Sequence, residues 1–267
     1  QFLDFKVKKN KKYSSIIFDN EFFENVTFFY NDSIDFDLDK EKKVFKIIQK
    51  DFYGRSFFVN GLIKNIQIDF EGKKELFNQK ISNRYDHNTL TGCLSFIKIY
   101  FENTELNSTS SICEDGINLI NSKGKIKKIS SKNSLFDGVD FDFSNLSIEQ
   151  INIENSLNDC IDFSSGTYIV ENSILKKCGD KGISVGEGTI ANFQKIDVSS
   201  SNIGLASKDS SKVFLENSKM WDVMTCYASY KKKQEFNGGQ IKINNSNCKN
   251  FNTEIYVDNF SSIEVMN

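Results

Sequence analysis

The sequence predicts an all-β protein: a right-handed parallel β-helix, built as a solenoid of coils of about 22 residues, with an irregular N-terminal cap region. One observation is a repeat that opens on aspartate, at spacings of 22, 22 and 21 residues. Another is that polar and apolar residues alternate within each repeat, and no amphipathic helical pattern separates the alternating segments. The repeat is clearest at Asp115, Asp137, Asp159 and Asp180.

The first 60 residues are expected to form the cap or early coils, because their alternation is less regular. We predict strands there at residues 16–18, 25–29 and 44–48. A solenoid needs a cap, since an open terminal coil exposes strand edges. The chain is thus predicted to be one continuous domain, with the cap region at 1–60 and the β-helix at 61–267.

Two polar segments interrupt the repeat, near residues 71–91 and 230–239, after a first coil strand at 62–70. The earlier segment contains Arg84 and His87, the only histidine. Insertions in solenoids often lie on the functional face, so we expect Arg84 and His87 to bind a ligand. Tolerated variation in loop length is the alternative for either segment.

Each coil is expected to carry a second short strand that ends in an Asn-Ser step. Asparagine tolerates left-handed backbone and bonds to its own main chain, which suits a tight corner. From residue 115 onward the period leaves room for roughly seven coils. The predicted corners are Asn133-Ser134, Asn155-Ser156, Asn172-Ser173, Asn217-Ser218 and Asn245-Ser246.

The composition excludes several classes of protein. A net charge of −2 offers no electrostatic basis for binding nucleic acid, and no apolar run approaches the roughly 18 residues of a membrane span. Proline is absent while Lys, Asn, Phe and Ile abound, a bias typical of an AT-rich bacterial genome. The start at Gln1 without a signal-type segment indicates a mature or excised chain, and fusion to another domain stays open.

Six cysteines fall into pairs of near neighbours, each pair spanning roughly one coil. Disulfides between them are therefore geometrically possible, and an even count favours an extracytoplasmic location: periplasmic, secreted or cell-surface. Free cysteines stacked in the core are the alternative. No CxxC spacing suggests a zinc site. The pairs are Cys93/Cys113, Cys160/Cys178 and Cys226/Cys248.

Strand alternation assigns the side chains of one segment to two faces. We expect Val139, Phe141 and Phe143 to point into the core. Asp140 and Asp142 then point outward. The aspartates that open each repeat are expected instead to cap the backbone at corners.

An acidic column follows from the register of neighbouring coils. Asp162 is expected one coil from Asp140, with Asn118 on the other side and Ser184 continuing the column. Asp140, Asp142 and Asp162 would then lie within roughly 5–7 Å of one another. Three such carboxylates suit a Ca²⁺ ion, or acid–base work on sugars. A merely solvated acidic face is the alternative.

Four segments resemble the ordered motifs of polygalacturonase-type glycoside hydrolases, which are right-handed parallel β-helices of the pectate lyase-like superfamily. The family motifs are Asn-Thr-Asp-Gly, Asp-Asp-Cys, Gly-His-Gly and Arg-Ile-Lys. The resemblance covers residues 137–208, roughly a quarter of the chain. The segments are Asp137-Gly-Val-Asp140, Asn158-Asp159-Cys160-Ile161, Cys178-Gly-Asp-Lys181-Gly182-Ile-Ser-Val-Gly186 and Gly204-Leu-Ala206-Ser-Lys208.

The resemblance implies roles for single residues. Asp137 matches the first catalytic aspartate and Asp159 the second of the Asp-Asp pair, while Lys208 matches the substrate-binding lysine. Three positions depart from the family, and together they make ordinary polygalacturonase activity improbable. Asn158 replaces an aspartate, Lys181 the histidine, and Ala206 the arginine that grips a sugar carboxylate.

Other members of this superfamily are lyases and epimerases that use a lysine or arginine base, often with Ca²⁺. Lys181 could supply such a base, although nearby carboxylates would raise the pKa of its ammonium. We therefore predict an extracytoplasmic protein that binds or acts on an acidic polysaccharide along residues 115–208. Its substrate contacts are expected from Asp140, Asp162, Lys208, Arg84 and His87. A non-catalytic surface, adhesin or structural module is the alternative. It predicts that Asp140→Ala, Asp162→Ala and Lys208→Ala leave partner binding intact.

Overall fold

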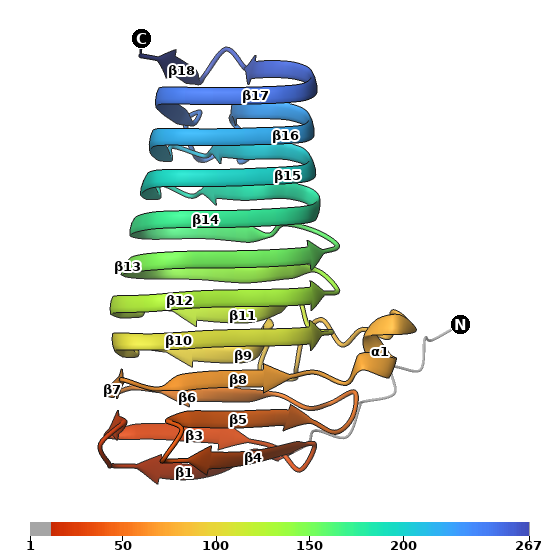
Figure 1. The fold of residues 1–267 in the computed structure, drawn as a ribbon, viewed down its shortest axis with the longest axis vertical. Coiled ribbons are helices and arrows are strands. Elements are labelled where there is room, and N and C mark those ends of the chain that lie inside the picture. Colours follow the sequence, from red (N-terminus) through yellow and green to blue (C-terminus); the bar gives the residue numbers. More distant parts are fainter. Residues whose placement is uncertain (1–11, 267) are drawn as a thin grey trace.

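The computed structural model describes residues 12–266 and is a β-solenoid of about ten turns (Figure 1). Successive coils lie about 22 residues apart in sequence, and only about 2% of the residues are helical. The predicted all-β fold of stacked coils is confirmed. Within residues 12–266, no helix combines the length and apolar character needed to cross a membrane.

The N-terminal strands form the lower end of the molecule in Figure 1. They are β1 (Ser14–Phe18), β2 (Phe23–Glu24), β3 (Val26–Tyr30), β4 (Ile34–Asp39), β5 (Val44–Gln49), β6 (Ser56–Val59), β7 (Leu62–Lys64) and β8 (Gln67–Glu71). After the short helix α1 (Lys74–Asn78) follow β9 (Gly92–Ile97), β10 (Tyr100–Ser111), β11 (Asp115–Ile120), β12 (Lys123–Ser134), β13 (Asp137–Ser156), β14 (Ile161–Gly186), β15 (Ile190–Lys208), β16 (Lys212–Tyr230), β17 (Gln240–Val257) and β18 (Ser262–Val265).

The cap differs from the coils in the direction of its strands. β1 pairs antiparallel with β3, β3 with β6, and β4 with β5. β1, β3 and β5 confirm the three strands predicted there, while β4 and β6 were not predicted. A phenylalanine cluster joins cap to coils: the Phe23 and Phe58 rings stack at 5.9 Å, and Phe58 stacks on Phe96 of β9 at 5.3 Å.

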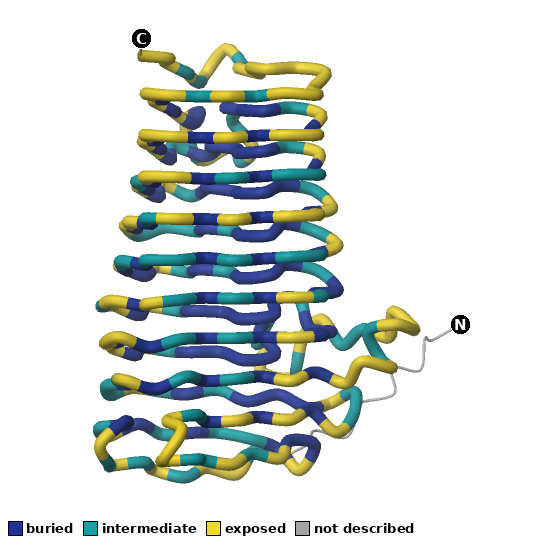
Figure 2. Tube along the Cα trace, in the orientation of Figure 1, coloured by how far each residue is buried: buried dark blue, intermediate teal, exposed yellow. Residues whose placement is uncertain are grey.

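Each coil presents three faces, and the pairing between coils is parallel. The first face contains β9, β11 and the opening residues of β13, with the equivalent residues of later coils. β10, β12 and the later residues of β13 form the other two faces. In Figure 2 the strands nearest the viewer alternate buried and exposed residues, whereas β9 and β11 behind them are largely buried.

The core consists of identical positions stacked coil on coil. Ile117 pairs with Val139, which pairs with Ile161, and all three side chains are fully buried. Phe141 and Phe163 stack with ring centroids 4.6 Å apart and planes 11° apart. Each fully buried side chain of this kind contributes about 1.5–3 kcal/mol of hydrophobic stabilisation.

The prediction that Phe143 faces the core is wrong. Its side chain is 59% exposed, and its backbone has a positive φ of 51°. The chain turns a corner at Phe143 toward the second face, so the alternation that places Phe141 inside does not continue. Tyr168 fills the space near this corner instead: it is buried, and its hydroxyl accepts a hydrogen bond of 3.1 Å from the Ser144 amide.

The asparagine corners are confirmed in part. Asn133 and Asn155 have positive φ angles of 59° and 65° and lie at equivalent corners. In later coils the positive-φ residue at this corner is another one, such as Lys177 at 58°. The steps that open with Asn172, Asn217 and Asn245 lie earlier in their coils, because Asn172 pairs with Gln150 and Asn217 with Asn245.

The three predicted cysteine pairs are all disulfides, which the sequence had left as one of two alternatives. The Cα atoms are 5.3 Å apart in Cys93–Cys113 and in Cys160–Cys178. The distance is 6.5 Å in the third bond, which joins Cys226 of β16 to Cys248 of β17.

Candidate functional site

Six aspartates from three consecutive coils lie together on the outer side of the first face. We call this set the aspartate face. Parallel pairing of β11, β13 and β14 stacks the three coils in register. Its members are Asp115, Asp137, Asp140, Asp142, Asp159 and Asp162.

One column of the aspartate face consists of corner residues that bond to the next coil. Asp115 pairs with Asp137. The Asp137 Oδ1 atom accepts hydrogen bonds from the Asp159 amide at 2.8 Å and from Asn158 Nδ2 at 2.7 Å. Asp159 Oδ1 in turn accepts a bond of 3.0 Å from the Lys181 amide. The predicted capping role of these aspartates is therefore confirmed for Asp137 and Asp159, across coils.

This column continues with Lys181 and not with Asp180, so the alignment of Asp180 with the other repeat aspartates is wrong by one residue. The Asp180 amide donates to the Asn158 carbonyl at 3.1 Å, while the Cys160 amide donates to the Lys181 carbonyl at 2.8 Å. The spacing of 21 residues, where the preceding ones are 22, is the trace of this shift.

The second column has the predicted register. Asp140 pairs with Asn118 on one side and with Asp162 on the other. Ser184 belongs to the following coil and pairs with Ala206 beyond it. The column therefore changes from acidic to small and neutral residues within two coils.

Asn118 connects two of the acids. Its Nδ2 atom donates to Asp140 Oδ2 at 3.2 Å and to Asp142 Oδ2 at 3.0 Å. Asn118 itself is fully buried, and it lies one coil closer to the cap than these two acids. The second carboxylate oxygen of Asp140 has no hydrogen-bond partner among the described residues.

Burial and mutual repulsion raise the pKa values on the aspartate face. The pKa of Asp137 is raised to about 9, by burial first and then by the Asp159 carboxylate. Burial raises the pKa of Asp115 to about 8, with Asp142 among the charges that add to it. The pKa of Asp159 rises only to about 6, since burial raises it but the Lys181 ammonium opposes the rise. Burial, followed by the Asp115 charge, raises the pKa of Asp140 well above its usual range.

Two lysines border the acids, and both are already paired. Lys181 Nζ lies 3.4 Å from Asp159 Oδ1 and also bonds to Asp180. Burial alone would lower the pKa of the Lys181 ammonium, but these carboxylates raise it above its usual value. Lys208 Nζ lies 3.9 Å from Asp162 Oδ1, and its side chain passes over Gly186, where a Cβ would lie 3.1 Å from the lysine Cε.

The earlier insertion borders the cap side of the aspartate face. Arg84 forms an ion pair with Glu114, next to Asp115, and its guanidinium lies 4.7 Å from the centroid of the Phe136 ring. The hydrogen bond to Glu114 is the largest cause of the raised pKa of Arg84, and Asp137 adds to it. The ligand-binding role expected for Arg84 stays a prediction. His87 instead stacks on Tyr13 with centroids 5.9 Å apart.

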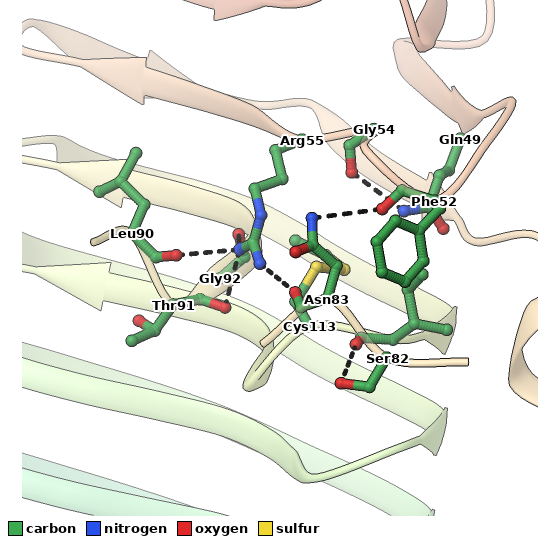
Figure 3. Close-up of a disulfide and its surroundings, with 12 residues drawn as sticks. Gln49, Phe52, Gly54, Arg55, Ser82, Asn83, Leu90, Thr91, Gly92 and Cys113 are labelled. Carbon is green, nitrogen blue, oxygen red and sulfur yellow. Dashed lines mark hydrogen bonds between the residues drawn. A yellow bond between two sulfur atoms is a disulfide. The ribbon is translucent and has the colours of Figure 1, made fainter. Parts of the chain in front are cut away.

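A buried arginine fastens this insertion to the coils (Figure 3). Arg55 Nη1 donates to the carbonyls of Leu90, Thr91 and Gly92 at 2.8–3.0 Å, and Nη2 bonds to the Asn83 carbonyl. These bonds hold the end of the insertion where it enters β9, beside the Cys93–Cys113 disulfide.

The later insertion borders the opposite side. Asp209 Oδ1 accepts bonds from the amides of Lys232 at 2.8 Å and Lys233 at 2.7 Å, and Lys233 forms an ion pair with Glu187. Burial is the largest cause of the raised pKa of Asp142, and the Glu187 charge adds to it. Both insertions therefore meet the face that carries the acids. Sequence reasoning missed Glu187, Asp209 and Arg55, since nothing in their local pattern shows which insertion they hold.

The proposed calcium ligands Asp140, Asp142 and Asp162 are neighbours but are not arranged as a metal site. Across residues 12–266, no group of three or more His, Cys, Asp or Glu side chains is placed so that it could hold a metal ion. The Asn118 amide lies between the carboxylates of Asp140 and Asp142, where a cation would need oxygen ligands.

The chain was also compared with known proteins. No protein-family model, no curated protein and no solved structure matches it. The arrangement of the aspartate face is therefore interpreted from its own geometry.

Proposed function

We propose that this protein is an extracytoplasmic, carbohydrate-active β-helix protein that binds a polysaccharide along the aspartate face and cleaves it by acid–base chemistry. The observation that carries the proposal is the row of buried, stacked carboxyl groups whose pKa values are spread from about 6 to about 9. Glycoside hydrolysis needs one carboxylic acid and one carboxylate that flank the scissile bond, and different environments keep one protonated and the other ionised. Asp137 and Asp159 keep the carboxyl groups of two polygalacturonase-type motifs, while Asn158, Lys181 and Ala206 depart from the family pattern.

Asp137 and Asp159 take the two roles. Asp137, protonated at neutral pH, gives its proton to the glycosidic oxygen as the bond to the anomeric carbon breaks. Asp159, ionised at neutral pH, accepts a proton from water as the water oxygen bonds to that carbon. Lys181 holds Asp159 in place; as a stable ammonium it does not serve as a general base.

The extracytoplasmic location is supported by the disulfides. Three disulfides and no free cysteine occur within residues 12–266. Such bonds persist mainly in oxidising compartments, and reducing compartments keep most thiols free.

The test is an assay on a panel of neutral, acidic and amino polysaccharides. Hydrolysis is measured by the release of reducing ends, and lyase activity by the absorbance of unsaturated products. Asp137→Asn and Asp159→Asn are each expected to lower the rate at least 100-fold, as for loss of a general acid or base. Asp37→Asn is the control, because Asp37 is exposed on β4 in the cap. Unsaturated products, or full activity in both variants, would contradict the assignment.

A second candidate function is non-catalytic glycan binding by a surface module. The pairing of Lys181 and Lys208 with carboxylates favours it, because it neutralises part of the acidic row without any substrate. It predicts saturable binding with no turnover for any polymer in the panel.

A further inference from the structure

We infer that the glycan bound by the aspartate face is cationic, with free amino groups on its sugars. This inference rests on the proposed function, since it names the substrate class of the same site. It replaces the acidic polysaccharide that the sequence led us to expect.

The aspartate face carries more carboxyl groups than ammonium groups. Six aspartates on three coils face two lysines, and each lysine already lies beside a carboxylate. Burial keeps several of these carboxyl groups protonated near neutral pH, and an ammonium group bound beside them would favour their ionised form. The Lys181 ammonium is hydrogen-bonded to Asp159 and Asp180, so it is not free to hold a sugar carboxylate. A uronate chain laid along this face would bring like charges together at short range, and such contacts are costly.

Several buried polar atoms at the aspartate face have no hydrogen-bond partner, which is an observation independent of charge. Asn118 and Ser184 are fully buried, and neither Asn118 Oδ1 nor Ser184 Oγ has a partner within the described part of the chain. The same holds for Asp115 Oδ2 and Asp140 Oδ1. Asn118 lies among the acids, because its own Nδ2 atom donates to two of them.

Each of these oxygen atoms can accept a hydrogen bond from a ligand donor. A buried polar atom without a partner costs about 1–3 kcal/mol, which a bound donor relieves. Among sugar substituents, an ammonium carries three donors and no acceptor, whereas a carboxylate carries only acceptors. A carboxylate would therefore leave these oxygens unpaired and add repulsion, while an amino sugar would satisfy both the charge and the hydrogen bonds.

The shape of the face favours a polymer over a single compact cation. The acids extend over three stacked coils, each about 4.8 Å from the next, and no three of them close around one point within residues 12–266. A chain with amino groups at intervals can meet successive coils, whereas one small ion would meet only one or two carboxylates.

The experiment measures binding by calorimetry at pH 7.5 with three oligosaccharides of equal length: glucosamine oligomers, their N-acetylated counterparts, and galacturonate oligomers. The glucosamine oligomer is expected to bind at least tenfold more tightly than the N-acetylated one, and galacturonate not to bind. Asp140→Asn and Asp162→Asn should each weaken glucosamine binding about tenfold, the loss of one hydrogen bond to a charged group, with Asp37→Asn unchanged. Circular dichroism checks that each variant is folded.

Equal or tighter binding of the N-acetylated or galacturonate oligomer would overturn the inference. So would equal binding of polylysine or of Ca²⁺ alone, because charge and not the glycan would then be recognised. The two proposals fail separately. Cleavage of a neutral or acidic polymer without glucosamine binding would reject the cationic substrate and keep the hydrolase. Tight glucosamine binding without cleavage would do the reverse.

Discussion

Replacing Asp137 by asparagine is expected to stabilise the folded protein at neutral and alkaline pH and to change little at acid pH. Asp137 is buried, and its pKa is raised to about 9, whereas an aspartate in an unfolded chain titrates near 3.9. Asparagine resembles the protonated acid, and its Oδ1 atom can keep the bonds from the Asp159 amide and from Asn158.

Proton linkage gives the sign and the size of this effect on the free energy of unfolding. Between about pH 4 and about pH 9 the unfolded chain has lost a proton that the folded state retains, so the free energy of unfolding falls as pH rises. One such group lowers it by about 1.4 kcal/mol per pH unit, or at most about 4 kcal/mol by pH 7. Allowing for local relaxation of the buried site, we expect Asp137→Asn to gain about 2–4 kcal/mol over the wild type at pH 7.5.

The assay is urea unfolding followed by circular dichroism at pH 4.5, 6.0 and 7.5, with the disulfides intact. Wild-type stability should decline across this series, and Asp137→Asn should remove part of the slope. The remaining slope reflects Asp115 and Asp140, whose pKa values are also raised by burial. Asp37→Asn should follow the wild type. Wild-type stability that rises with pH, or an unchanged slope in Asp137→Asn, would contradict this expectation.

Two further predictions concern the coils themselves. Phe163→Ala should lower the free energy of unfolding by about 3–5 kcal/mol, because Phe163 is fully buried and stacks on Phe141; urea unfolding measures this, and a loss below 1 kcal/mol would mean that the coil collapses onto the cavity. Removing the Cys160–Cys178 disulfide with a double serine variant should cost about 2–4 kcal/mol. Mass spectrometry of the wild type first shows whether this bond is formed, and equal stability of the oxidised wild type and the variant would contradict the expectation.

Much of the fold could be predicted from local sequence patterns because a solenoid repeats one set of contacts. The period located Asn118, Asp140 and Asp162 in neighbouring coils, since residues one period apart pair directly. The same arithmetic identified the three cysteine pairs, each spanning about one coil. Alternation placed Val139 and Phe141 in the core.

The same rules failed wherever a corner breaks the alternation. Phe143 is apolar and lies on the odd positions, yet a left-handed backbone turns it outward. Asp180 begins the same sequence pattern as the other repeat aspartates, yet Lys181 occupies the position that stacks on Asp159. Corner geometry depends on how each coil bonds to its neighbours, and a count of residues alone does not contain that information.

The stacked-coil architecture and the pairing of Asn118, Asp140 and Asp162 could be predicted from the sequence alone, because both follow from a repeat period. The chemistry open to the aspartate face depends on contacts between coils that are visible only in three dimensions. Burial raises the pKa values of several acids, the Asn118 amide donates hydrogen bonds to two of them, and Lys181 and Lys208 each lie beside a carboxylate. Those effects arise between side chains that are tens of residues apart in the chain, and it is their distances and burial that set the charge the face presents to a ligand.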